Sequence, residues 1–373
     1  MSRYVVGVIL GVGWSLTGCH VVFSSDDAQS NGDAVSDGMV DATVDANAIP
    51  PNYVFITNNV FLGDFGGIAG ANATCSDAAQ ANNLKGTFIA LLGTTGTDYN
   101  AFDLLQSSQG WIRTDGALVA GSVADFTNGN LRNAIVLDEK GNRPPETTIW
   151  TGLDASGSPA ADNCMAFTAT NANSSTGDTS SLLTTLAVRK AACTIPTHLL
   201  CISINSATLP TPLTPPPNSK RIFLSTATFT GSAGLAAMDN KCANEAMAAL
   251  GSNNFDALLS TLAESAMTRA GILSDQLFTR VDRSPVGPLE KAPLTFLNQH
   301  ADGTFLPAGS ATGVWTGGAP NTTSLANGNC TNWSTTGVTG IIGNANAATP
   351  AAYAVTGTQS CASPVRHVYC VEH

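Results

Sequence analysis

Charged side chains are scarce in this 373-residue sequence: they make up 12% of the chain, and there are only five histidines. Cys-x-x-Cys and His-x-x-x-His spacings, which are typical of structural zinc sites, are absent from the sequence. Lys and Arg form no cluster, so the electrostatic signature of nucleic-acid or heparin binding is missing too. The net charge is −11. We therefore expect no nucleic-acid partner, no metal and no cofactor.

What the sequence does contain is one spaced pattern that occurs twice. Cysteines follow one another at intervals of 89, 29 and 8 residues in the first copy and 88, 31 and 9 in the second, and a Trp-Thr-Gly precedes the second cysteine of each. The two copies are Cys75, Trp150-Thr151-Gly152, Cys164, Cys193, Cys201 and Cys242, Trp315-Thr316-Gly317, Cys330, Cys361, Cys370. We predict two copies of one domain, 53–205 and 220–373, each long enough for its own core. The proline-rich segment 206–219 predicts a stiff linker.

The nine cysteines divide into four per copy and one left over, Cys19. An even set in an exported chain indicates a disulfide framework. Spacing alone leaves three pairings open in each copy.

The amino terminus has the features of an export signal. Arg3 precedes an apolar run over 4–16, which is too short to be a convincing membrane span. The sequence Leu16-Thr17-Gly18-Cys19 resembles the lipobox of bacterial lipoproteins. This resemblance implies that 1–18 is a signal peptide and that Cys19 is lipidated, with several acyl chains for stable membrane anchoring. An ordinary signal peptide is the alternative. By the retention rule of familiar Gram-negative bacteria, a residue other than Asp after the lipidated cysteine favours the outer membrane. His20 stands there, so the outer membrane is the expected location.

Residues 19–52 predict a disordered acidic tether behind the lipidated cysteine. They contain six Asp and no Lys or Arg, and they lack the apolar residues needed to fold. Asp recurs every fourth residue from Asp33 to Asp45, which suggests a calcium loop, but the glycine and glutamate of such a loop are missing. We favour a solvated spacer.

Local patterns predict a mixture of strands and helices. Two long loops, 120–148 and about 282–313, precede the Trp-Thr-Gly motifs. The expected strands are 53–57, 84–92, 111–119, 198–204, 221–225 and 367–371, and the expected helices are 71–82, 98–106, 239–250 and 255–270.

Several runs of the first copy resemble endostatin and the endostatin-like domains of bacterial lipoproteins, whose function is unknown. They are Gly67-Ile68-Ala69-Gly70-Ala71, Gly86-Thr87-Phe88-Ile89-Ala90-Leu91-Leu92, Ile149-Trp150-Thr151-Gly152, 176–183 and Leu200-Cys201-Ile202. The second copy matches more loosely. The resemblance implies an α+β fold of two tandem C-type-lectin-like domains, each a twisted, mostly antiparallel sheet with two helices and long loops.

The resemblance also implies nested disulfides, first cysteine to fourth and second to third. These are Cys75–Cys201, Cys164–Cys193, Cys242–Cys370 and Cys330–Cys361. Trp150 and Trp315 are expected to pack against the core, with ligand stacking as the alternative.

The known activities of these families are not expected to carry over. The Glu/Gln-Pro-Asn/Asp turn and the Trp-Asn-Asp of calcium-dependent lectins are absent, as are the amino-terminal histidines and the basic surface of endostatin. His198 and His367 each lie three residues before the last cysteine of their copy, which raises the possibility of a shared catalytic role. No nucleophile or carboxylate recurs beside them, so we favour structural strand histidines and expect no enzyme.

The expected function is binding or adhesion by a lipid-anchored envelope protein, with a protein or polysaccharide ligand. A structural envelope component without a ligand, or a hydrolase of surface polymers, is the alternative. The long loops are the expected ligand surface, because such loops usually carry function on a rigid frame. Their candidate residues are Asp125, Asn130, Arg132, Asp138, Glu139, Arg283, His300 and Asp302.

Overall fold

The structure is a computed structural model that describes residues 51–95, 98–204, 213–307, 310–355, 357–362 and 365–373. The chain divides into two units, Met1–Ala48 and Ile49–His373. The described residues all belong to the second unit. The predicted signal peptide, Cys19 and nearly all of the predicted tether lie outside the described residues.

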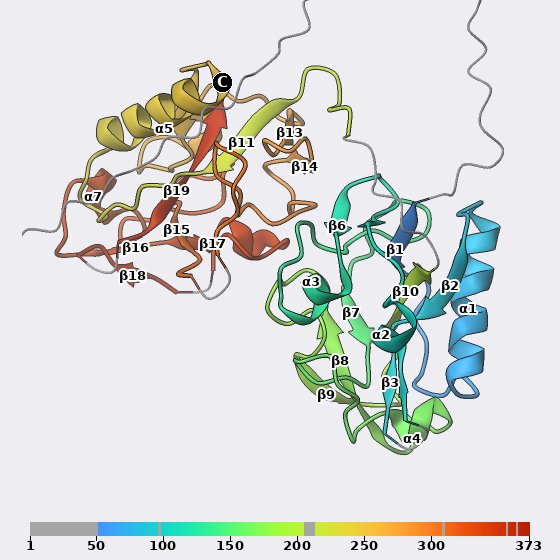
Figure 1. Cartoon of the computed structure of the whole chain (residues 1–373). Helices are drawn as coiled ribbons and strands as arrows, with labels where there is room; N and C mark the ends of the chain where they lie inside the picture. The colour runs from blue at the N-terminus through green and yellow to red at the C-terminus, as the bar shows by residue number, and fades with distance from the viewer. Residues whose placement is uncertain (1–50, 96–97, 205–212, 308–309, 356, 363–364) are drawn as a thin grey trace, which may run out of the picture. The chain divides into compact units, whose positions relative to one another are not determined.

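The first repeat is built around an eight-stranded sheet, with the 14-residue helix α1 and three short helices around it (Figure 1). Its strands and helices are β1 Asn52–Ile56, α1 Ile68–Ala81, β2 Thr87–Ala90, β3 Gly93–Thr94, β4 Tyr99–Asn100, α2 Ala101–Leu104, β5 Trp111–Ile112, β6 Leu118–Ala120, α3 Val123–Thr127, β7 Thr148–Trp150, α4 Cys164–Phe167, β8 Asn173–Asp178, β9 Arg189–Ala192 and β10 His198–Ile204.

The second repeat has a seven-stranded sheet built on the same plan. Its elements are β11 Lys220–Leu224, α5 Leu235–Leu250, β12 Phe255–Ala257, α6 Ala266–Arg269, β13 Leu277–Thr279, β14 Pro285–Pro288, β15 Gly313–Trp315, α7 Cys330–Trp333, β16 Thr339–Gly340, β17 Ile342–Asn344, the 3-10 turn η1 Pro350–Ala352, β18 Gln359–Ser360 and β19 His367–Glu372. Both repeats are therefore mixed α+β, with much sheet and little helix.

The last strand of each repeat is the centre of its sheet. β10 pairs antiparallel with β1 and β2 and parallel with β7, while β19 pairs antiparallel with β11 and β12 and parallel with β15. Parallel pairs are the minority in both sheets, so each sheet is mostly antiparallel, as expected.

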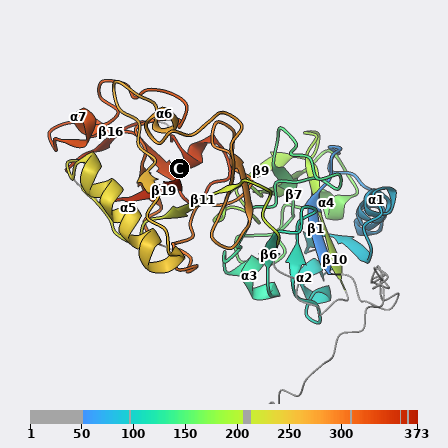
Figure 2. The same cartoon turned by 90° about the horizontal axis from the view of Figure 1, so that it is seen from above.

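Each main helix is amphipathic through small residues. In α1, Ala71, Cys75 and Ala79 are buried at four-residue spacing, so one face lies on the sheet while the polar face meets solvent. Figure 1 shows α1 running alongside β2, and Figure 2 shows α5 beside β19.

Four disulfides tie the helices and turns to these sheets. They are Cys75–Cys201, Cys164–Cys193, Cys242–Cys370 and Cys330–Cys361, the pairs that the endostatin resemblance implied. The long-range bond of each repeat joins its main helix to the central strand. The shorter bond fixes α4 or α7.

The Trp-Thr-Gly motif is a structural unit. Trp150 and Trp315 are fully buried, and their indole N–H groups donate to the carbonyls of Phe61 and Phe229 over 2.9 Å each. Gly152 has φ 58°, and a Cβ there would lie 2.3 Å from the carbonyl oxygen of Gly93. Only glycine fits this position. The expected packing of the tryptophans against the core is confirmed.

The short elements α4 and α7 are left-handed. All four residues of each have φ between 50° and 64°. This conformation costs about 1–2 kcal/mol per residue, so the surroundings must hold it in place. In both repeats an asparagine side chain caps the turn, Asn163 or Asn329, and a disulfide begins at its first residue.

The expected helix over 255–270 is wrong. Phe255–Ala257 form β12, which pairs with β19, and the only helical residues of this range are the four of α6. Phe255 and Ala257 are buried and Asp256 between them is not, which is a strand pattern. The pairing with a strand more than a hundred residues away overrides local helix propensity.

Smaller differences concern the first repeat. The expected helix 98–106 contains only the four residues of α2, and the expected strand 111–119 is the hairpin of β5 and β6. The loop 120–148 contains the short helix α3, whose capping box of Ser122 and Asp125 is a recognisable sequence signal.

Candidate functional site

The two long loops, predicted as separate ligand surfaces, meet each other. Phe296 and Ala348 of the second repeat are fully buried in the same apolar cluster as Ala134 and Leu182 of the first. The polar groups around this cluster make hydrogen bonds between the repeats. The junction of the loops is therefore the candidate functional site.

Two buried arginines each donate hydrogen bonds to main-chain carbonyls of both repeats. Arg113 donates from Nη1 to the carbonyl of Ala134 in its own repeat and to the carbonyl of Leu294 in the other. Arg280 donates from Nη1 to the carbonyl of Phe296 in its own repeat over 3.1 Å and to that of Arg132 in the other over 2.6 Å.

These contacts obey an approximate two-fold symmetry. Arg113 corresponds to Arg280 in the repeat, Ala134 to Phe296, and Arg132 to Leu294. A short antiparallel bridge joins the equivalent residues Ser181 and Ala347. Its two hydrogen bonds run from Leu182 N to Asn346 O at 3.1 Å and from Ala348 N to Ser180 O at 2.7 Å. The interface is therefore self-complementary, as between the subunits of a two-fold dimer.

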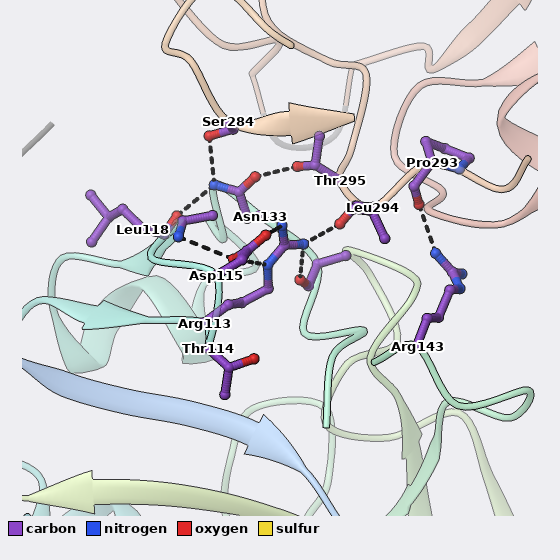
Figure 3. Close-up of polar contacts among 12 residues, drawn as sticks. Arg113, Thr114, Asp115, Leu118, Asn133, Arg143, Ser284, Pro293, Leu294 and Thr295 are labelled. Carbon is purple, nitrogen blue, oxygen red and sulfur yellow. Dashed lines mark hydrogen bonds and ion pairs between the residues drawn. The ribbon is translucent and has the colours of Figure 1, made fainter. Parts of the chain in front are cut away.

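Asn133 stands at the centre of this symmetry, opposite its equivalent Thr295 (Figure 3). The amide of Asn133 donates to Ser284 Oγ over 3.1 Å and to the carbonyl of Leu118 over 2.7 Å. Its Oδ1 accepts the hydroxyl of Thr295. All of its hydrogen-bonding atoms are thus used, as a buried amide requires.

Each of the two arginines is almost completely buried, with 0% and 1% of the side chain exposed, and each is neutralised by an aspartate two residues later. Burial lowers the pKa of Arg280, and Asp282 opposes this effect. Burial would raise the pKa of Asp282, but the guanidinium of Arg280 holds that pKa below its usual value. Paired charge and carbonyl acceptors together make the burial tolerable.

A third arginine fills one side of the junction. Arg143 donates from Nη1 to the carbonyl of Pro293 over 2.8 Å and from Nη2 to the carbonyl of Ala348 (Figure 3 shows the first contact). Burial and the nearby Arg113 lower the pKa of Arg143 to about 10. Its fork therefore bridges two main-chain carbonyls of the opposite repeat.

On another side of the junction there is a groove of about 320 Å³. Asp125, Asn130 and Arg132 line it from the first repeat, and Asn298 and Phe305 line it from the second. A smaller hollow of about 160 Å³ shares Gly129 and Leu182 with it. We call the larger hollow the loop groove.

The predicted loop residues fall into three groups. Asp125, Asn130 and Arg132 line the loop groove. Arg283 and Asp302 are exposed elsewhere. Asp138, Glu139 and His300 are buried, with 0%, 8% and 8% of the residue exposed, and they hydrogen-bond to the main chain, which makes them parts of the frame.

The two equivalent histidines have structural hydrogen bonds. His198 Nδ1 lies 2.5 Å from the carbonyl of Thr57, and His367 Nδ1 lies 2.7 Å from the carbonyl of Ser225. Because a carbonyl only accepts, each Nδ1 carries the proton. Both bonds join the last strand to the loop after the first strand, as the structural interpretation expects.

Sequence reasoning missed Arg113, Arg280 and Phe305. One signal was available for the arginines, because Arg-x-Asp recurs after the Trp111 strand and after the Phe278 strand. For Phe305 the sequence gives no local signal, since its importance depends on which surfaces meet.

Among the residues that the structure describes, no three His, Cys, Asp or Glu side chains are grouped so as to hold a metal ion. The same part of the chain has no helix long and apolar enough to cross a bilayer.

No protein-family model matches the chain, and a search of curated proteins finds no relative.

Proposed function

We propose that this protein is an exported, lipid-anchored binding protein of the bacterial envelope that holds its ligand in the loop groove. Cys19 carries the lipid, 20–52 is the tether, and the outer membrane is the site of anchoring. The two repeats are C-type-lectin-like domains of the endostatin-like kind, and they act without catalysis. The ligand is a protein or a polysaccharide.

The observation that carries the proposal is the meeting of the two long loops. Three of the residues predicted as ligand contacts, Asp125, Asn130 and Arg132, line one groove together with the other loop. A concave site with a few polar groups on a stiff frame is the usual form of a binding site. Four disulfides suit an oxidising compartment outside the cytoplasm.

The first test is a screen of glycans and envelope or matrix proteins with the chain from His20 onward, which lacks the lipid. We expect a ligand whose binding falls at least tenfold in the double variant Asn130→Ala, Arg132→Ala. Both side chains are exposed, and the carbonyl of Arg132 that Arg280 uses is retained.

The matched control is the double variant Arg283→Ala, Asp302→Ala. It also changes two exposed polar residues of the long loops, but these lie outside the loop groove. Equal loss in both variants would contradict a site in the groove. A chain that retains no ligand would instead favour a structural envelope component.

A further inference from the structure

We infer that the loop groove binds the guanidinium group of an arginine side chain on a protein or peptide ligand. The inference rests on the proposed function and names the chemistry of the same site. It comes from the approximate two-fold symmetry of the junction. Under this symmetry the loop groove is equivalent to a site that Arg143 of this chain already fills.

Arg143 and Phe305 are equivalent residues of the two repeats. Asn142 and Thr304, which precede them, accept from the main-chain N–H of Asp138 and His300 over 2.8 Å in each case. In the same alignment Pro293 corresponds to Leu131, and Ala348 to Leu182. The two carbonyls that Arg143 bridges therefore have counterparts in Leu131 and Leu182.

Both counterparts line the loop groove, together with Phe305. The groove is thus the symmetry mate of the Arg143 site, with a phenylalanine where the other half has arginine. In the described part of the chain, no hydrogen bond reaches the carbonyl oxygen of Leu131 or of Leu182. Two acceptors that hold a guanidinium on one side are left without a donor on the other.

A third acceptor points to the same ligand. Asn298 is 2% exposed and lines the groove. Its amide donates to Asn346 Oδ1 over 3.0 Å, while its own Oδ1 is buried without a hydrogen-bond partner within the described residues. Buried polar atoms are nearly always paired, so the unpaired Oδ1 of this groove-lining residue is an acceptor that a donor from the groove could complete after a small side-chain shift.

The number and arrangement of the acceptors favour a guanidinium over other donors. The carboxylate of Asp125 lies in the groove, where its Oδ2 caps α3 through Gly121 N and Ser122 N. A planar fork serves two or three acceptors at once, which a compact ammonium does less well. The ring of Phe305 adds an apolar wall, although Arg280 already lies 5.0 Å from the centre of this ring. The exposed Arg132 at the rim offsets the charge of Asp125 and can donate to a carbonyl of the same ligand, so we expect one arginine per groove.

The experiment titrates N-acetyl-arginine methylamide into the chain from His20 onward and follows side-chain amide signals by NMR. We expect a saturable shift of the Asn298 amide, with a dissociation constant on the order of 1 mM because the probe is small. The matched neutral probe is the citrulline derivative, which has nearly the same shape and no charge. We expect it to bind at least tenfold more weakly.

Two variants probe the site in opposite directions. Phe305→Arg places the chain's own guanidinium in the groove, as Arg143 does in the other half, and should weaken probe binding at least tenfold. Asn298→Asp adds a negative charge and should strengthen it several-fold. If Phe305→Arg does not fold, Asn298→Asp decides.

The inference is overturned if arginine and citrulline probes bind equally, if the arginine probe gives no saturable shift, or if neither variant changes its affinity. These outcomes leave the proposed function separately testable. If a ligand from the screen contains no arginine and yet loses its affinity in Phe305→Arg, the result supports binding in the groove and contradicts the arginine chemistry. A ligand unaffected by any groove variant would contradict both.

Discussion

Arg113 donates to the carbonyl of Leu294, and Arg280 donates to the carbonyl of Arg132. Each of these two equivalent arginines thus hydrogen-bonds to the long loop of the other repeat. Both arginine side chains are buried, with 0% and 1% of their surface exposed to solvent. The loops expected to bind other molecules therefore contact each other first, and the proposed ligand site is the loop groove beside their junction.

The first prediction concerns the stability of this junction. Arg280→Met should lower the free energy of unfolding by about 3 kcal/mol, because it leaves Asp282 and two carbonyls without their donor. Arg221→Met is the matched control: its ion pair with Glu372 is partly exposed, at 31% and 20% of the side chains, and should contribute less than about 1 kcal/mol. Urea unfolding followed by circular dichroism measures both. Similar losses would argue against a special role for the buried arginine.

A second prediction concerns Arg143. Arg143→Ala removes a double hydrogen bond to Pro293 and Ala348 and should cost about 2 kcal/mol of stability. It also opens the symmetry mate of the loop groove. Calorimetry with the arginine probe should then show two sites in place of one. Lys140→Ala, an exposed neighbour, should leave the stoichiometry at one. A single site in both variants would contradict the equivalence of the two halves.

The third prediction is a pH dependence. Burial lowers the pKa of His367 below its ordinary value of 6.5, and the nearby His300 lowers it further, while the carbonyl of Ser225 opposes the shift. The unfolded chain therefore binds more protons in the window below 6.5, so this contribution to stability is complete above pH 6.5 and is lost as the pH falls through that window.

The measurement is the urea midpoint at pH 7.5 and pH 5.5. His367→Gln should lose less stability on acidification than the unmodified chain does. His373→Gln, at the partly exposed carboxyl terminus, should behave like the unmodified chain. An unchanged pH slope in His367→Gln would show that other groups cause the dependence.

The disulfides give a fourth prediction. Peptide mapping without reduction should recover Cys75 with Cys201 and Cys164 with Cys193, and the equivalent pairs in the second repeat. The Cys75–Cys201 bond spans 126 residues, so its removal in Cys75→Ala, Cys201→Ala should cost about 5 kcal/mol in the chain-entropy model. Any peptide that links the two repeats, or a large fraction of free thiol in the exported protein, would contradict the pairing.

The last prediction concerns the anchor. If Cys19 is acylated, the protein should enter the detergent phase in a temperature-induced phase separation, and Cys19→Ala should stay in the aqueous phase or remain unprocessed. Ser24→Ala, in the predicted tether, is the control and should partition like the unmodified protein. Unchanged partitioning of Cys19→Ala would rule out lipidation at this residue.

The sequence by itself determined the features whose signals are local or duplicated. The repeated cysteine intervals marked the two copies, and the Trp-Thr-Gly motif marked a buried tryptophan because its spacing recurred. The main helices were close to prediction because alanine and cysteine recur at helical spacing in α1 and α5. The pairing of the cysteines came only from the resemblance to endostatin, since spacing left three choices.

Tertiary structure alone decided the rest. β12 is a strand because β19 offers it hydrogen bonds, and no pattern within 255–270 reports a partner so far along the chain. The contact between Arg113 and Leu294 likewise joins residues far apart in the sequence. Arg143 and Phe305 occupy equivalent places in two loops of unlike sequence, and this equivalence is visible only in the packed structure. Local periodicity encodes which face of an element is buried, but it does not encode which other surface will cover it.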